Sequence, residues 1–266
     1  LRLEICQHFD QYANVRPSRL LPGIQSPLKN IGPAELDWVI VRENTEGEYS
    51  GAGGRVHPKL PQEVGIDVSV FTRDGIERVM RYAFELALTR PKKQLTLVTK
   101  SNAQRHGMVL WDEVFENLKH DYPGITTDRM LVDAITTRMV LQPQSLDTIV
   151  ATNLHADILS DLAAALSGSL GIGPTANINP ERTFPSMFEP IHGSAFDLVG
   201  KDLANPLGAF WSCVMMLEHL QEKKGASLLM SAIEEVCQEG RHLPKDLGGN
   251  SCTGEVTTAV CAALKK

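Results

Sequence analysis

Two carboxylates, Asp157 and Asp161, stand one helical turn apart in TIVATNLHADILSDLAAALSGSLG, where most other residues are small or apolar. Like charges at this spacing destabilise an isolated helix by roughly 0.2–0.5 kcal/mol. Residues 139–181 contain no Lys or Arg that could offset this repulsion locally. Two carboxylates on one helix face can bind a divalent cation such as Mg²⁺ or Mn²⁺, with water or substrate oxygens completing its coordination.

A solvated helix face is the alternative interpretation of the same spacing. The apolar side chains cluster away from the two carboxylates, at Ile158, Leu159, Leu162 and Leu166. Against this alternative, the flanking residues are Ser160, Ala164 and Ala165, where a solvated face normally carries Lys, Glu or Gln. Small neighbours leave room for a ligand to approach the carboxylates.

The composition is that of a globular protein with a small-molecule ligand. A chain of 266 residues can bury a substantial core, as one large or two modest domains. The formal net charge of -6 and the lack of a dominant basic stretch argue against a nucleic-acid partner. The five cysteines are odd in number, widely spaced and without a metal-binding pattern, so we expect reduced, packing residues in an intracellular protein.

Membrane and targeting signals are not evident. No run of about 18 apolar residues occurs, so we expect no membrane span. The chain opens with LRLEICQHFD, without Met or a leader pattern, and we expect that an N-terminal segment is missing from this sequence. A cytoplasmic location is predicted, with targeting to an organelle left open.

Strand and helix patterns alternate along the chain. Short runs rich in Val, Ile and Thr predict strands over 36–43, 95–100 and 146–153. Apolar periodicity predicts helices over 72–90, 107–122, 206–220, 227–238 and 253–265. Gly, Pro, Ser and Asn punctuate residues 168–196, which we predict to be a long loop of functional importance. The alternation predicts an α/β fold.

Longer motifs around the carboxylate pair resemble a known enzyme family. NLHADILSDLAAALSGSLGIGPTANIN and FEPIHGSAFDLVGKDLANPLGAFWSCVMMLEH are similar to segments of the β-decarboxylating dehydrogenases, which act on isocitrate, 3-isopropylmalate, or tartrate and D-malate. YANVRP, VIVRENTEGEYSG, VTKSN and VDAITTRMVLQP extend the match in the expected order. FDQYANVRP, RENTEGEYSGAGGRVH and NPERTFPSMFEP resemble the tartrate/D-malate branch most.

The resemblance implies a metal site shared between two subunits. Asp157 and Asp161 would bind Mn²⁺ or Mg²⁺ together with the substrate's 2-hydroxyl and adjacent carboxylate. Asp133, in VDAI, would join them from the other subunit of a homodimer. The cation would supply the missing positive charge and polarise the C2 oxygen, which favours loss of CO₂.

The resemblance also assigns substrate-binding and catalytic residues. Arg16 in NVRP and Arg42 in IVRE match the family's substrate arginines, whose planar guanidinium groups hold carboxylates bidentately. From the residues alone, a salt bridge to a neighbouring glutamate is the alternative for Arg42. Tyr49 in GEYSG matches the tyrosine that protonates the enolate, and Lys100 in VTKSN matches the base supplied by the partner subunit. Without the resemblance, both would be interpreted as structural residues.

One position departs from the family pattern. Relatives place a third substrate arginine where this chain has Cys6. Arg2 lies four residues upstream, and a local shift would let it serve as a substrate-binding residue in that position; whether it does stays open.

The nucleotide site is assigned by the resemblance as well, because no GxGxxG motif follows a strand. The family binds the adenosine of NAD at the loop EPIHGSAFDLVGKDLANP. The implied cofactor-binding residues are Asn153, Glu189, His192, Gly193, Ser194, Ala195, Asp197 and Asn205. A carboxylate at Asp197 beside the ribose would favour NAD over NADP.

The resemblance therefore predicts an α/β, isopropylmalate dehydrogenase-like fold with two domains around central mixed sheets. Residues 12–167 would form the small substrate and dimerisation domain. Residues 1–11 and 168–266 would form the remaining part of the large nucleotide-binding domain, without its N-terminal part.

The predicted function is the NAD- and divalent-metal-dependent oxidation, with or without decarboxylation, of a (2R)-hydroxy dicarboxylate such as D-malate or tartrate. Two alternatives stay open. One is a 3-isopropylmalate dehydrogenase, and the other is a truncated, non-catalytic paralogue.

Overall fold

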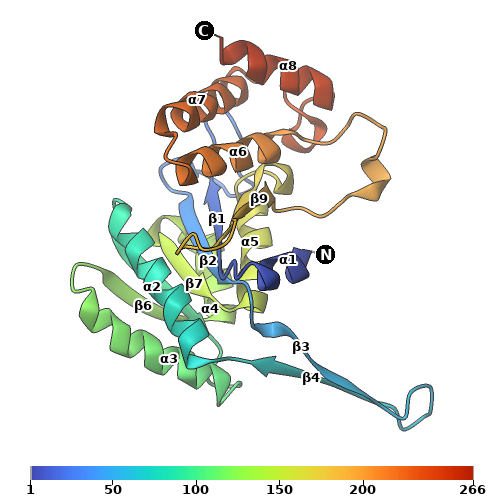
Figure 1. Ribbon diagram of the computed structural model, residues 1–266. Coiled ribbons are helices and arrows are strands. Elements are labelled where there is room, and N and C mark those ends of the chain that lie inside the picture. Colours follow the sequence, from blue (N-terminus) through green and yellow to red (C-terminus); the bar gives the residue numbers. More distant parts are fainter. Residues whose placement is uncertain (1, 266) are drawn as a thin grey trace.

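A computed structural model describes residues 2–265, and its centre is a sheet of seven strands in the order β6-β5-β7-β2-β1-β8-β9 (Figure 1). Four neighbouring strands are parallel: β2 (Asp37–Glu43), β5 (Gln94–Thr99), β6 (Thr126–Leu131) and β7 (Thr148–Ala151). The antiparallel strand β1 (Ala13–Arg19) lies between β2 and β8 (Pro174–Ile178), and β9 (Met187–Pro190) forms the edge beyond β8. The α/β fold with a central mixed sheet is as predicted.

Helices cover both faces of this sheet. α2 (Arg73–Thr89) and α3 (Gly107–Leu118) pack on one face, and α4 (Val132–Leu141) and α5 (Asn153–Leu166) pack on the other. Since side chains alternate along a strand, Val41 of β2 joins the core under α2 and α3, whereas Ile40 joins the core under α5. Each face of the sheet therefore has its own hydrophobic core.

The C-terminal helices extend the core on the α5 side. α6 (Leu207–His219), α7 (Lys223–Glu239) and α8 (Thr253–Ala263) form a layer at one end of the molecule (Figure 1). The three predicted helices are all present, with α7 beginning four residues earlier than predicted. α1 (Arg2–His8) leads into β1. None of the helices within residues 2–265 is both long and apolar enough to cross a membrane.

Two predicted boundaries are wrong. The segment 168–196 is not one loop, because it contains β8 and β9. These two strands pair with each other, and β8 also pairs with β1. All five residues of β8 are buried, so long-range pairing, rather than local composition, makes this segment a strand. The strand predicted over 146–153 ends at Ala151, because the Thr152 hydroxyl caps α5 by accepting a hydrogen bond from the backbone N–H of His155.

A two-stranded ribbon projects away from the main body. β3 (Gly47–Val56) and β4 (Val64–Val70) pair only with each other, and the ribbon extends well beyond the seven-stranded sheet (Figure 1). Its apolar side chains Val56, Val64 and Ile66 are each about half exposed. We call β3, β4 and their connection the β3–β4 arm.

The division into a small unit over 12–167 and a large remainder stays a prediction. The seven-stranded sheet crosses that boundary, because Ala13 of β1 pairs with Ile178 of β8. The outer limits of the predicted division, residues 1 and 266, lie outside the described residues.

We predict that Phe84→Ala in α2 destabilises the fold by about 3–5 kcal/mol, because it removes a fully buried ring from the core. Phe84 stacks on Tyr122 with ring centroids 4.6 Å apart and lies 5.5 Å from the ring of Phe115. Urea unfolding followed by circular dichroism measures the loss. Leu88→Ala, at an exposed position of the same helix, is the control and should change stability by less than about 1 kcal/mol.

Candidate active site

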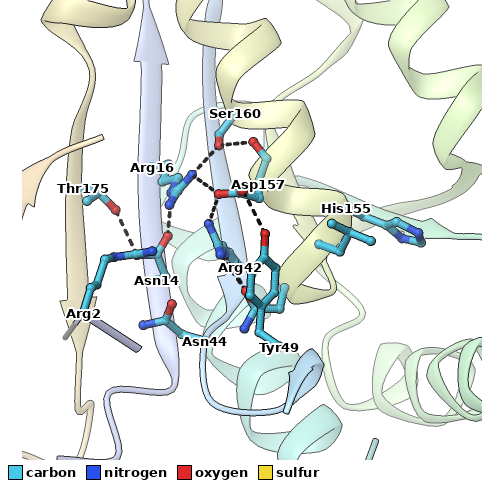
Figure 2. A network of polar contacts seen from close by, with 12 residues as sticks. Arg2, Asn14, Arg16, Arg42, Asn44, Tyr49, His155, Asp157, Ser160 and Thr175 are labelled. Atoms are coloured by element: carbon cyan, nitrogen blue, oxygen red, sulfur yellow. Dashed lines mark hydrogen bonds and ion pairs between the residues drawn. The ribbon is translucent and has the colours of Figure 1, made fainter. Parts of the chain in front are cut away.

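The predicted substrate residues meet beside α5, at the edge where the parallel strands end (Figure 2). The sheet register explains this meeting. Asn14 of β1 lies opposite Arg42 of β2 on one side and opposite Asn177 of β8 on the other. Arg16 is two residues after Asn14 and therefore faces the same side of the sheet, towards α5. The carboxyl edge of such a sheet is the usual place for a ligand.

Arg16 and Arg42 both bond to one carboxylate oxygen of Asp157. Nη1 of Arg16 lies 3.2 Å from Oδ1 of Asp157, and Nη1 of Arg42 forms a short bond to the same atom. The arginines are 3% and 1% exposed, respectively, and buried charges of this kind require such partners. The glutamate alternative for Arg42 is wrong, because its ion pair is with Asp157.

Burial shapes the protonation of both arginines. Burial, followed by the positive charges of Arg42 and Arg2, lowers the pKa of Arg16 to about 9. Burial also lowers the pKa of Arg42, although Asp157 opposes the shift. A pKa of about 9 keeps Arg16 charged at neutral pH. The site therefore concentrates positive charge that an anionic ligand can neutralise.

The two carboxylates of α5 differ in their surroundings. Burial tends to raise the pKa of Asp157, but Arg42 and Arg16 outweigh it and lower that pKa below its usual value. Burial and then the charge of Asp157 raise the pKa of Asp161. Asp161 is exposed and accepts no hydrogen bond from a side chain within residues 2–265. A cation between the two carboxylates would relieve this repulsion.

Tyr49 completes the cluster from the base of the β3–β4 arm. Its hydroxyl donates to Oδ2 of Asp157 at 3.2 Å, and the Arg42 guanidinium lies 5.5 Å from the centre of its ring. Burial, and then Asp157, raise the pKa of Tyr49, so the hydroxyl keeps its proton at neutral pH. The neighbouring Glu48 ties the arm to α5 by accepting hydrogen bonds from the Thr152 hydroxyl (2.9 Å) and the Leu154 N–H (3.2 Å).

Lys100 and Asp133 form a separate pair. Nζ of Lys100, directly after β5, lies 2.5 Å from Oδ1 of Asp133 in the first turn of α4. Within residues 2–265 of one chain, no three His, Cys, Asp or Glu side chains converge to hold a metal ion. The structure thus brings Arg16, Arg42, Tyr49 and Asp157 together but not Asp133.

Arg2 lies close to the arginine cluster although it belongs to α1. Its Nε donates to Oε1 of Glu189 at 2.6 Å, and Nη2 donates to Oδ1 of Asn177 at 3.3 Å. Its positive charge lowers the pKa of both Arg16 and Arg42, and Asn177 links it to Asn14, which bonds to Arg16. Cys6, also in α1, is buried, and its Sγ lies 3.6 Å from the same oxygen of Asn177.

A pocket of about 990 Å³ gathers most of the predicted nucleotide residues. Its lining includes His192, Gly193, Ser194, Ala195 and Asn205 on one side, and Ser169, Leu170, Gly171, Lys245 and Asp246 on the other. Ala195 adopts the left-handed conformation, which turns the chain into the pocket wall. The side chain of Asn205 donates to Oδ2 of Asp246 at 2.9 Å and thereby links the two sides.

Three predicted cofactor residues lie outside the lining of this pocket. Asp197 is exposed. Glu189 pairs with Arg2, and Oδ1 of Asn153 accepts from Nε of Arg42 at 2.9 Å. Their contacts with a cofactor stay predictions.

Sequence reasoning missed several polar residues of the site. Arg16 donates hydrogen bonds to Oδ1 of Asn14 at 2.8 Å and to the Ser160 hydroxyl at 2.6 Å. Oδ1 of Asn177 in turn accepts from Nδ2 of Asn14. The two-residue spacing of Asn14 and Arg16 was a usable signal for a shared face. No signal could place Asn177 beside them, because that contact depends on the pairing of strands far apart in the sequence.

We predict that Asp157→Asn lowers the free energy of unfolding by about 1–2 kcal/mol at neutral pH, because two buried arginines lose their counter-charge. Asp161→Asn is the isosteric control and should leave stability unchanged or slightly raised, because it removes a repulsive charge. Since the folded-state pKa of Asp157 is lowered, the wild-type advantage is present above the unfolded pKa of about 4 and fades as pH falls below it. Denaturant titrations of both variants across pH measure this difference.

Comparison with known proteins agrees with this geometry. The chain matches the sequence model of the isocitrate/isopropylmalate dehydrogenase family over residues 2–262. It is 66% identical over 264 residues to a probable tartrate dehydrogenase/decarboxylase of Agrobacterium vitis, covering 99% of this chain and 74% of the relative. It is 48% identical over 267 residues to the decarboxylating D-malate dehydrogenase of Escherichia coli strain K12, covering 98% of this chain and 74% of the relative.

A solved structure extends the similarity to the fold. The crystal structure of isocitrate dehydrogenase from Methylococcus capsulatus superposes with a TM-score of 0.92 at 37% identity, covering 100% of this chain and 77% of that one. These relatives confirm the resemblance read from the motifs, including its leaning towards tartrate and D-malate enzymes. The chain belongs to the isocitrate/isopropylmalate dehydrogenase family.

Proposed function

We propose that this chain oxidises a (2R)-hydroxy dicarboxylate, such as D-malate or tartrate, with NAD and a divalent cation, and that the β-carboxylate can leave as CO₂. The observation that carries the proposal is the convergence of Arg16 and Arg42 on Asp157, with Tyr49 on its other oxygen. Relatives named tartrate dehydrogenase/decarboxylase and D-malate dehydrogenase support this choice of substrate.

The arginines would bind the substrate's carboxylates. Guanidinium groups suit this task because their N–H donors match both carboxylate oxygens. Arg16 and Arg42 are held rigidly by buried partners, so a bound acid would meet donors that are already oriented. Arg2, at the side of the cluster, would supply a third positive charge for the second carboxylate.

The donor set of α5 fits a divalent cation. Asp157 and Asp161 offer carboxylate oxygens one helical turn apart; burial and then the charge of Asp157 raise the pKa of Asp161, and a cation would offset the repulsion between the two carboxylates. These two residues would hold Mn²⁺ or Mg²⁺ with Asp133 of a second chain. When bound, the cation polarises the C2 oxygen and favours decarboxylation.

Tyr49 and Lys100 would move protons. The raised pKa of Tyr49 keeps its hydroxyl protonated, as a proton donor to the carbon that loses CO₂ must be. Lys100, whose Nζ lies beside Asp133, would act in its neutral amine form as the base that accepts the proton of the 2-hydroxyl of the substrate bound to the partner chain.

The pocket lined by His192, Gly193 and Asn205 would bind the adenosine of NAD. Its volume of about 990 Å³ is at the upper end of the usual range for ligand pockets. His192 would face the adenine, and the exposed backbone of Gly193 and Ser194 would allow close approach. The carboxylates that line the pocket, Asp202 and Asp246, disfavour an additional phosphate and so support NAD over NADP.

A second copy of the chain would complete the site. A two-stranded ribbon is marginally stable alone in water, yet the β3–β4 arm exposes Val56, Val64 and Ile66. Burial of these side chains in a homodimer would stabilise the arm. The same association would bring Lys100 and Asp133 of one chain to Asp157 of the other.

We predict that the purified full-length enzyme with Mn²⁺ reduces NAD faster with D-malate or tartrate than with 3-isopropylmalate or isocitrate. The absorbance of the reduced nicotinamide measures each rate. A preference for 3-isopropylmalate would replace the proposed substrate, and no turnover of any of the four acids would favour a non-catalytic role.

Tyr49→Phe should lower kcat by about 10²–10⁴-fold, because it removes the proposed proton donor and keeps the ring against Arg42. Tyr82→Phe is the matched control, since Tyr82 lies in α2 on the opposite side of the sheet. Steady-state kinetics with D-malate compare the two. Equal rates in both variants would remove Tyr49 from the mechanism.

A further inference from the structure

A chain of buried amides connects the arginines of the site. Asn14 and Asn177 are both fully buried and bond to each other, with Nδ2 of Asn14 2.7 Å from Oδ1 of Asn177. Asn14 accepts from Nε of Arg16 at 2.8 Å. Asn177 accepts from Nη2 of Arg2 at 3.3 Å. The two amides therefore form a direct path between two guanidinium groups on different elements.

The path is fixed at both ends and in the middle. Nδ2 of Asn14 also donates to the Thr175 hydroxyl at 2.9 Å, which sets the orientation of its amide. Nδ2 of Asn177 donates to Oε1 of Glu189 at 3.0 Å, and the same oxygen accepts from Nε of Arg2 at 2.6 Å. Rotation of either amide would leave buried donors facing donors, so the network permits one arrangement.

Both buried arginines are held in the same manner. Arg16 has an asparagine oxygen on Nε and Asp157 on Nη1, and Arg42 has Oδ1 of Asn153 on Nε and Asp157 on Nη1. Asp157 supplies one negative charge for two arginines, and an amide oxygen orients each guanidinium group without adding a second. Asparagine at these positions thus fixes geometry and leaves the pair of arginines with an excess positive charge for an anionic ligand.

We propose that Asn14 is a positioning residue that sets Arg16, and through Asn177 its separation from Arg2, for a substrate with two carboxylates. The proposal rests on the proposed function, because it assumes that these arginines bind the acid. Asn14 acts through Arg16 and does not touch the substrate. It acts on binding, so its loss changes KM more than kcat.

The test uses two substitutions at one position in the full-length enzyme. Asn14→Ala removes the acceptor of Arg16 and should raise KM for D-malate by about 10- to 100-fold, the effect of losing a charge-assisted hydrogen bond, with a much smaller change in kcat. Asn14→Asp keeps an acceptor of the same shape but cancels the charge of Arg16 and faces Asn177 with a second acceptor. It should also raise KM at least tenfold, to about the range of the alanine variant.

Asn179→Ala is the matched control. Asn179 is 1% exposed, and its side chain carries an equally complete set of bonds, to the backbone of Asp10, Thr183 and Phe184, but within residues 2–265 it bonds to no guanidinium group. Its loss should lower the unfolding midpoint as much as Asn14→Ala does and leave KM unchanged. Thermal unfolding of each variant gives this comparison.

Binding measured without turnover separates the two proposals. Calorimetric titration of D-malate with Mn²⁺, in the absence of NAD, should show weaker binding in both Asn14 variants and unchanged binding in Asn179→Ala. An active wild type with unchanged KM and affinity in the Asn14 variants overturns the positioning role alone. If Asn14→Ala does not fold, Asn14→Asp decides the question. A wild type that neither binds nor oxidises D-malate or tartrate overturns both proposals.

Discussion

The site depends on one electrostatic arrangement: the carboxylate of Asp157 serves two arginines that the sheet buries almost completely. Two cations this close repel each other, and burial removes the water that would screen them. Asp157 stabilises both, and its position on α5 fixes the helix against β1 and β2. The remaining features, from the tyrosine at its second oxygen to the repelled Asp161, follow from where this carboxylate lies.

Local sequence predicted the strands β2, β5 and β7, the helices α2, α3, α6, α7 and α8, and much of the cluster. The helix periodicity of α2 agrees with the structure because one face of that helix is buried against the sheet, and the apolar run of β2 agrees because that strand is buried on both faces. The residues Arg16, Arg42, Tyr49 and Asp157 could be predicted because short motifs surround each of them. The four side chains meet because of the way the strands pair, and the short motifs carry no information about strand pairing.

The features that sequence could not provide are long-range ones. β8 was predicted to be loop because its glycine and proline neighbours dominate the local composition, yet it is a fully buried strand beside β1. The bond between Asn14 and Asn177 joins residues 163 positions apart. In a sequence, asparagines of this kind resemble ordinary turn formers. Only their burial within the sheet shows that they bond to the arginines of the site.

The central place of β1 in the sheet determines what partial unfolding does to the site. Because this strand bonds to β2 on one side and to β8 on the other, nothing can detach it without splitting the sheet into two parts. The same strand carries Asn14 and Arg16. A partly unfolded molecule that has released β1 has therefore lost Arg16 and its partner Asn14 from the site at the same moment as the continuity of the sheet. The pairing of β1 therefore supports both ligand binding and the cooperative folding of the sheet. A change that releases β1 impairs the two together.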